Sequence, residues 1–424
     1  MAKKEKLAIL GGPKAIKSTA ENMFTWPIIT KQDEKAALDV LRTGRMSGLD
    51  VTMKFEEEYA KWHKTRYALC HCNGTSSLQA AMYGCGIGIG DEVIVQSLTF
   101  WASATQLYSL GATPVFAEVD PSTFTIDPND IEHRITKRTK AIIVVHYCGY
   151  PTDMDPIMKI ARKHKLKVIE DVSHAHGGLY KGKLVGTIGD VGAMSLMTYK
   201  SLAIGEGGVL ITNNKEIYER AIAFGHYIRH PYTLTIPPLK RNEGIPFGGV
   251  KYRINQIASA VGRVQLKHYR KRMETIQKAM NCFWDLLEDV PGIRAHRPSR
   301  KSRCTMGGWY FPRGLYVKEE LGGLPVSKFC EAVTAEGYET THGANFPLHL
   351  HPVFNDVDVY GHGKPTRIAN TKRDVRQPKG SLPVTESMPE RTFDIPWFKH
   401  YRPRIIKEHA KAFRKVAEQA EELL

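Results

Sequence analysis

The sequence lacks any long run of apolar residues. Apolar residues make up 42% of its 424 positions, but no stretch approaches the roughly 18 consecutive apolar residues that a membrane-spanning helix needs. The N-terminal stretch "MAKKEKLAILGG" also lacks the apolar core of a signal peptide. We therefore expect a globular, cytoplasmic protein with no membrane partner.

Cysteine is present in an odd number and without metal-ligand spacing. Most of the seven cysteines lie in apolar stretches, as reduced core thiols do. Cys70 and Cys72 flank His71, but no second cysteine or histidine pair completes a tetrahedral zinc set. Two histidine pairs also lack carboxylate or cysteine partners at suitable spacing, namely His174 with His176 and His349 with His351. We predict no metal site.

The sequence has few acidic residues for its number of basic ones: 60 Lys and Arg outnumber 44 Asp and Glu and give a net charge of +16. Such an excess fits either nucleic acid or small anionic substrates. The basic clusters at 134–140 and 162–167 have no interleaved aromatic residues and no helix-turn-helix pattern. We expect a solvated basic surface and no nucleic-acid partner, with DNA binding as the alternative.

Short apolar strands alternate with helices over the first half of the chain. The predicted strands are 91–97, 113–120, 140–149, 166–171, 192–198 and 207–213. We predict one helix at 99–111 and another at 153–165. In the second, Met154, Ile157 and Ile160 recur at helical spacing. This alternation predicts an α/β fold with a mostly parallel sheet.

From residue 254 the pattern becomes helical as far as Leu287, and beyond it strand-like and helical pieces alternate less regularly. We predict a large domain at 31–270, preceded by an N-terminal segment at 1–30. A smaller C-terminal α/β domain is predicted at 271–424, with a long loop at 351–404.

Three polar groups follow predicted strands, at the edge of the sheet where ligands of α/β proteins bind. Gly74, Thr75 and Ser76 begin a helix and offer hydroxyl and backbone N–H groups to an anion such as phosphate. Asp171 ends one strand, and Lys200 follows another just before a glycine-rich turn. A phosphate cradle, a carboxylate and a free amine are what pyridoxal 5′-phosphate (PLP) needs. We therefore predict PLP as the cofactor.

Two neighbouring motifs bear on this site. Phe100 follows the strand at 91–97, where its ring can cover one face of the cofactor, and Trp101 is the near competitor. The glycines at 84–91 imitate a dinucleotide-binding loop, but they follow a helix and precede a strand, the reverse of what that loop requires. We interpret them as a turn.

Several longer stretches match one family in their order along the chain: "NGTSSLQAAM", "GDEVIVQSLTFWASA", "KVIEDVSHAHG", "GAMSLMTYKSLAIGEGGVLIT" and "YRINQIASAVGRVQL". They resemble the DegT/DnrJ/StrS group of fold type I, PLP-dependent aminotransferases, which aminate keto-sugars and keto-cyclitols. The resemblance implies an aspartate aminotransferase-like fold with a seven-stranded sheet in the large domain.

The resemblance also implies roles for single residues. Lys200 would form the Schiff base with PLP and move the proton, and Asp171 would pair with the pyridinium nitrogen. The other residues implied at the cofactor are Thr75, Ser76 and Ser195 at the phosphate, Phe100 and Ser173 at the ring, and His174 at the phenolic oxygen. Relatives that dehydrate sugars carry histidine at the position of Lys200, so transamination is implied.

One position departs from the family pattern. The family usually has Asn directly before Tyr-Arg, reaching the cofactor phosphate of the neighbouring subunit, and this chain has Lys251 there. An ammonium can serve a phosphate as a point charge. If Lys251 does so, each active site needs two chains, and a homodimer is implied. On the substrate side, the resemblance makes His349 a candidate, and Arg229 could pair with a carboxylate or phosphate.

The predicted reaction is amino transfer from glutamate or glutamine to the ketone of a keto-sugar or keto-cyclitol such as an inosose. Two alternatives remain at this point. One is a PLP-fold regulator that binds DNA, which the positive charge favours. The other is a different fold type I enzyme, such as a lyase.

Overall fold

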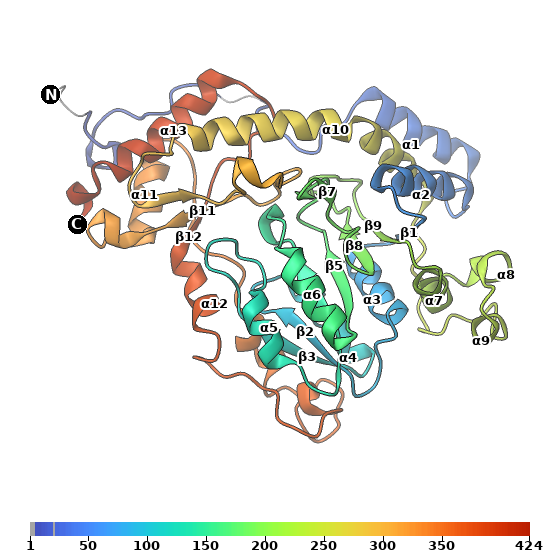
Figure 1. Cartoon of the computed structure of the whole chain (residues 1–424). Helices are drawn as coiled ribbons and strands as arrows, with labels where there is room; N and C mark the ends of the chain where they lie inside the picture. The colour runs from blue at the N-terminus through green and yellow to red at the C-terminus, as the bar shows by residue number, and fades with distance from the viewer. Residues whose placement is uncertain (1–4, 20–21) are drawn as a thin grey trace.

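The computed structural model describes residues 5–19 and 22–424 and is built around a central sheet (Figure 1). Seven strands lie in the order β1-β9-β8-β5-β4-β2-β3. Their bounds are β1 Tyr67–His71, β2 Glu92–Gln96, β3 Thr113–Ala117, β4 Thr139–Val145, β5 Lys167–Asp171, β8 Val191–Ser195 and β9 Gly208–Thr212. β9 runs antiparallel to both of its neighbours, and the remaining pairs are parallel. The predicted mostly parallel sheet is confirmed.

Helices cover both faces of this sheet, as its fully buried strands require. The helices along this part of the chain are α1 Lys31–Thr43, α2 Asp50–His63, α3 Gly74–Gly84, α4 Gln106–Ser109, α5 Pro128–Arg134, α6 Met154–His164, α7 Lys215–Gly225, α8 His230–Thr233 and α9 Pro237–Lys240. The helix predicted at 99–111 is wrong: the chain forms a short 3-10 turn at Trp101–Ser103 and then α4. Backbone angles of φ −127° and ψ −40° at Ala104 separate the two pieces.

A single 30-residue helix, α10 (Gln256–Asp285), connects the two parts of the molecule (Figure 1). The Asn255 side chain caps it by accepting a hydrogen bond from the Ala258 amide at 2.9 Å. Its first half packs against α1 and α2. Its second half joins a separate apolar core, in which Phe283 packs edge-on against Phe413.

This second core belongs to a smaller sheet and its helices. The elements are β10 Ile293–Ala295, β11 Arg313–Tyr316, β12 Thr392–Asp394, α11 Val326–Ala335 and α13 Pro403–Ala417. Leu7 and Met23 are buried in the same core, so the N-terminal segment packs with the C-terminal part of the chain. Residues 1–4 and 20–21 of the predicted segment lie outside the described residues.

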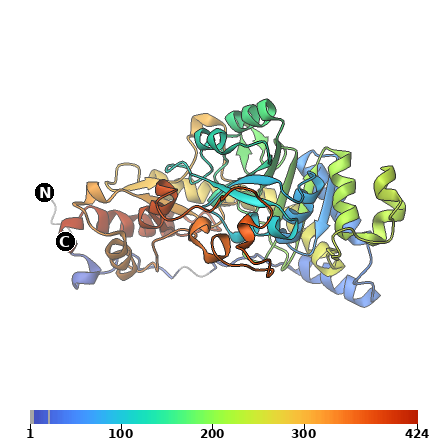
Figure 2. The same cartoon turned by 90° about the horizontal axis from the view of Figure 1, so that it is seen from below.

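The predicted long loop is packed on the large sheet over much of its length. Phe354, Leu382 and Met388 are buried in the same core as the central strands. The side-chain amide of Gln377 pairs with the backbone of Phe116 in edge strand β3, at 3.0 Å to the amide and 2.8 Å to the carbonyl. The segment therefore protects a sheet edge, and in Figure 2 it lies as an orange band across the strands.

Two minor features complete the description. A two-stranded hairpin pairs β6 (Leu179–Tyr180) with β7 (Lys183–Leu184), and α12 (Pro383–Ser387) lies in the segment across the sheet edge. Among residues 5–19 and 22–424, no helix combines the length and apolar character needed to cross a membrane. The exact domain boundaries stay a prediction.

Candidate active site

The carboxylate of Asp171 lies at the carboxyl end of β5 in the middle of the sheet. It is only 4% exposed. The Ser103 hydroxyl donates a hydrogen bond to Oδ2 at 2.8 Å, and the Ser173 amide donates to Oδ1 at 3.0 Å. Two hydrogen-bond donors therefore fix the orientation of the carboxylate.

Lys200 lies in the turn between β8 and β9. The Thr198 amide donates to the Gly205 carbonyl across this turn at 2.8 Å, and Gly205 has a left-handed φ of +98° that favours glycine. Lys200 is 8% exposed. Burial lowers the pKa of its amine to about 8, although the nearby Asp171 carboxylate acts in the opposite direction. A substantial fraction of the amine is therefore neutral in mildly alkaline solution.

The start of α3 faces the end of β8. Asn73 caps the helix, accepting a hydrogen bond from the Ser76 amide at 2.8 Å while the Ser76 hydroxyl donates to the Asn73 carbonyl. A Cβ added to Gly74 would lie 2.5 Å from Ser195 Cβ, so only glycine allows this close approach. The Ser76 hydroxyl is thus used within the cap, and Thr75 stays half-buried beside it. Free backbone N–H groups at such a helix start suit a phosphate.

Ser173, Ser195 and His174 complete this half of the site. The Ser195 amide donates to the Ser173 hydroxyl at 3.0 Å. The Cys148 amide donates to Nδ1 of His174 at 3.2 Å, so Nδ1 is the acceptor and the neutral ring carries its hydrogen on Nε2. Burial holds the pKa of His174 well below its usual range. A neutral imidazole with a fixed N–H donor results.

A loop from the smaller part of the molecule covers Lys200, and the sequence reasoning missed it. We call residues 306–313 the cover loop. The Lys200 amine lies 4.0 Å from the ring centre of Tyr310, and the Trp26 indole donates to the Lys200 carbonyl at 2.8 Å. Trp309 and Phe311 both have left-handed φ values, +55° and +53°, which are strained for bulky side chains. The run of three aromatic residues at 309–311 is the signal that could have found this loop.

Other predicted site residues lie outside this group of contacts. Phe100 and Trp101 are each 47% exposed, with ring centres 4.9 Å apart, so nothing separates the two as stacking candidates. Lys251 is exposed at the surface. The carbonyl of its neighbour Tyr252 accepts a hydrogen bond from the Cys72 amide at the end of β1.

His349 and Arg229, the predicted substrate residues, are both engaged by the chain itself. Both ring nitrogens of His349 are bonded, Nδ1 to the Ser97 hydroxyl at 2.7 Å and Nε2 to Glu386 at 3.0 Å. Arg229 is buried in an ion pair with Glu56 at 2.8 Å. These contacts give each residue a structural role.

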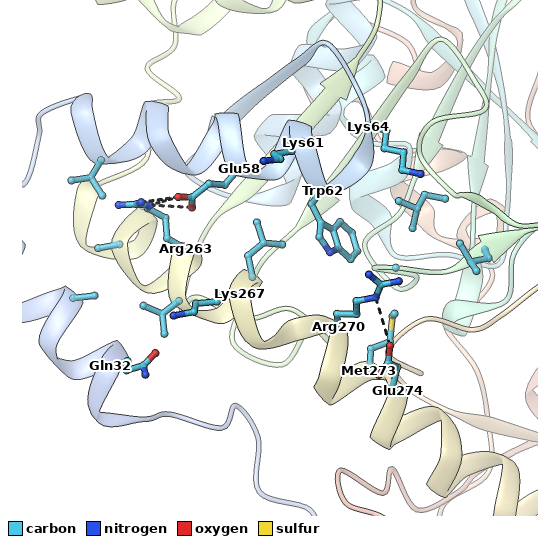
Figure 3. A pocket seen from close by; sticks show the side chains of 18 of the residues that line it. Gln32, Glu58, Lys61, Trp62, Lys64, Arg263, Lys267, Arg270, Met273 and Glu274 are labelled. Carbon is cyan, nitrogen blue, oxygen red and sulfur yellow. Dashed lines mark hydrogen bonds and ion pairs between the residues drawn. The ribbon is translucent and has the colours of Figure 1, made fainter.

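A wide groove lies elsewhere, between α1, α2 and α10, and has a volume of about 1330 Å³ (Figure 3). Its lining includes Trp62 and Lys267. Arg263 in this groove pairs with Glu58 at 2.6 Å. None of the predicted site residues lines it, so its size does not mark the catalytic centre.

Comparison with known proteins identifies the chain. The model of the DegT/DnrJ/EryC1/StrS aminotransferase family matches residues 27–395. The chain belongs to this family. It is 39% identical over 309 residues to the GDP-perosamine synthase of Escherichia coli O157:H7, an alignment that covers 72% of this chain and 78% of that protein.

Two further relatives support the assignment. The chain is 32% identical to the L-glutamine:2-deoxy-scyllo-inosose aminotransferase of Streptoalloteichus tenebrarius, over 78% of this chain and 80% of that one. The solved aminotransferase of Psychrobacter cryohalolentis has a TM-score of 0.80 at 28% identity, covering 94% of this chain and 99% of that one. The predicted family, fold type I architecture and aminotransferase class are confirmed.

Proposed function

We propose that this aminotransferase uses PLP to move an amino group from glutamate or glutamine to the ketone of a keto-sugar or keto-cyclitol. The observation that carries the proposal is the buried Lys200 amine with its lowered pKa, set beside the fixed Asp171 carboxylate. The similarity to a perosamine synthase and to a scyllo-inosose aminotransferase supports the two classes of acceptor.

The polar groups of this chain fit each polar group of PLP. The helix start at Gly74, with Thr75 and Ser195, would hold the phosphate, because a side chain at 74 would fill the space against β8. Asp171 would hold the protonated ring nitrogen. The Nε2 hydrogen of His174 would point to the phenolic oxygen, since Nδ1 is already occupied. When bound, PLP supplies an electron sink for the amino-transfer chemistry.

We propose that Lys200 carries the proton that moves during amino transfer. An amine whose pKa is about 8 can both accept a proton from the substrate carbon and return it at mildly alkaline pH. The Tyr310 ring over the amine limits the access of water and holds the amine in place. Ser173 bonds the Ser195 amide and so ties the phosphate end to the ring end of the site.

We propose that each active site includes a residue from a second copy of the chain. Lys251 is exposed, so its ammonium is free to reach the cofactor phosphate of a neighbouring subunit. A homodimer with shared sites would follow. His349 and Arg229 are held by Glu386 and Glu56, so we propose that other residues meet the substrate.

An absorbance titration tests this function. The purified protein reconstituted with PLP should show a band at roughly 410–430 nm that glutamate or glutamine removes. A nucleotide-linked keto-sugar and scyllo-inosose are then added separately, and the true acceptor class restores the band. A band that no amino acid removes, or a protein that does not bind PLP, would overturn the proposal. Release of a ketone without any amino donor would instead indicate a lyase.

A further inference from the structure

Arg313 is a buried cation whose hydrogen-bonding capacity is largely unused. It begins β11 at the end of the cover loop and is only 6% exposed. Its Nε and Nη1 have no hydrogen-bond partner among the described residues. Buried guanidinium groups are normally paired, since an unpaired buried donor destabilises the folded chain.

The nearest carboxylate does not meet this need. Asp394 Oδ1 lies 3.7 Å from Nη1, beyond hydrogen-bond distance. That oxygen already accepts hydrogen bonds from the Thr341 amide at 2.6 Å and the Thr341 hydroxyl at 2.8 Å. Phe311 supports the guanidinium from one side, with its ring centre 3.9 Å from Cζ. The group is therefore held in place and still has free donors.

The cover loop links Arg313 to the catalytic amine. Tyr310 lies over the Lys200 amine, and its ring centre is 6.1 Å from that of Phe311, which in turn supports Arg313. Phe311 has a left-handed φ, and the consecutive rings of Tyr310 and Phe311 contact two different basic side chains. A ligand with an anionic group close to the amine being transferred would reach Arg313 while its amine lies at Lys200.

We propose that Arg313 binds the α-carboxylate of the amino donor, an inference that rests on the proposed amino-transfer function. A guanidinium offers two parallel N–H groups to a carboxylate, which fixes the orientation of the ligand as well as attracting it. In an α-amino acid the carboxylate is one carbon from the amine. Anchoring the carboxylate at Arg313 presents the amine toward the position of Lys200.

A diphosphate of a nucleotide-linked acceptor is the other anion that could use these donors. The donor carboxylate is favoured because Arg313 is only 6% exposed and ends the loop whose Tyr310 ring covers the Lys200 amine. A planar carboxylate also needs only two parallel N–H donors. A diphosphate at the end of a sugar nucleotide would lie farther from the reacting ketone. The two sources are separable by experiment.

The test uses the PLP-loaded protein with Arg313→Gln and Arg313→Lys. Loss of the band at roughly 410–430 nm is titrated with glutamate, glutamine and 4-aminobutanoate, which is glutamate without its α-carboxylate. We expect Arg313→Gln to weaken apparent binding of both amino acids by about 10- to 100-fold, with partial recovery in Arg313→Lys. Titration with 4-aminobutanoate should be unchanged. Arg294→Gln, in the neighbouring strand β10 and paired with Glu320 at the surface, is the control that keeps full donor binding.

Calorimetry gives a readout that does not depend on turnover. Glutarate, which has both carboxylates of glutamate and no amine, should bind the wild-type protein more tightly than Arg313→Gln, whereas guanosine diphosphate should bind both equally. Equal losses with glutamate and 4-aminobutanoate, unchanged glutarate binding, or a loss confined to guanosine diphosphate would each overturn the inference. If the wild-type band responds to no amino acid, the proposed function itself fails, which is a different result.

Discussion

The two halves of the active site differ in how their polar groups are satisfied. The floor, residues 74–76, 171–174 and 195 on the large sheet, consists of groups that hold one another: Asp171 has two donors, and His174 is fixed by the Cys148 amide. The cover, formed by the cover loop and residues 397–399, leaves polar atoms of Arg313 and Trp309 without partners in the described part of the chain.

This difference indicates that the floor and the cover bind different ligands. A floor with satisfied hydrogen bonds is already arranged for its ligand and is specified by the ends of the strands. The cover has strained backbone and hydrogen-bond donors without partners, and these donors are available to a bound ligand. We infer that the floor serves the cofactor and the cover serves the substrates.

The largest expected effect comes from removing the Lys200 amine, which lies between the floor and the cover. Lys200→Ala should abolish the band at roughly 410–430 nm and lower turnover by at least about a hundredfold, since acid–base catalysis alone contributes roughly 10²–10⁴-fold. Spectra and steady-state rates measure both effects. Lys167→Met, at the opposite end of β5 from Asp171, is the matched control and should keep the band. Full turnover in Lys200→Ala would contradict the assignment.

A glycine substitution tests whether the floor depends on close backbone approach. In Gly74→Ala the new Cβ would meet Ser195 Cβ at 2.5 Å and its Cα at 2.7 Å, so backbone has to shift. We expect a loss of about 1–3 kcal/mol in the free energy of unfolding, together with weaker PLP binding. Gly88→Ala has nothing within 4 Å of its Cβ and should be neutral or slightly stabilising in the same thermal unfolding assay. Equal behaviour of the two variants would refute the close contact.

The pH dependence of cofactor uptake sharpens the assignment of Lys200. Only the neutral amine reacts with an aldehyde, and burial lowers the pKa of Lys200 to about 8. The rate of PLP incorporation into the cofactor-free protein should therefore rise about tenfold per pH unit below this value and level off above it. Stopped-flow absorbance measures the rate. A profile that levels off only near pH 10, the range of an ordinary lysine, would show that burial does not tune this amine.

Sequence reasoning predicted where the floor residues lie in the fold, because they follow the ends of strands that have a clear apolar pattern, and their roles at the cofactor stay a prediction. Asp171 ends β5, and Gly74–Gly84 forms the helix expected after β1. The cover was missed because Tyr310 and Arg313 are more than 100 positions from Lys200 in the sequence, and their contact depends on how the smaller sheet docks. No local periodicity reports such a contact.

The two predicted substrate residues illustrate the same limit. The sequence shows that Arg229 is basic and that His349 follows a family-like stretch, but not which partner each one finds. The partners, Glu56 and Glu386, lie in other elements, α2 and α12. Only the folded chain brings these charges together.

The smallest expected effect concerns Lys399 in the cover. Its amine lies 2.7 Å from the ring centre of Trp397, and the side chain is 3% exposed. Burial lowers its pKa to about 5, and no carboxylate among residues 5–19 and 22–424 forms an ion pair with it. Between that pH and the usual lysine value the unfolded chain binds a proton that the folded chain does not, so stability rises with pH over this window.

Lys399→Met should therefore stabilise the protein by about 1 kcal/mol or more, the equivalent of at least one pKa unit. The gain should be larger at pH 6 than at pH 9, because the cost of keeping the amine neutral grows as pH falls toward its lowered pKa of about 5. Thermal unfolding of both proteins at the two pH values measures this difference. Lys415→Met is the contrasting variant, since it breaks a buried pair with Glu336 at 2.8 Å and should destabilise. No gain from Lys399→Met at either pH would mean that the amine keeps its proton in the folded protein and that Trp397 and Trp26 stabilise it as a cation.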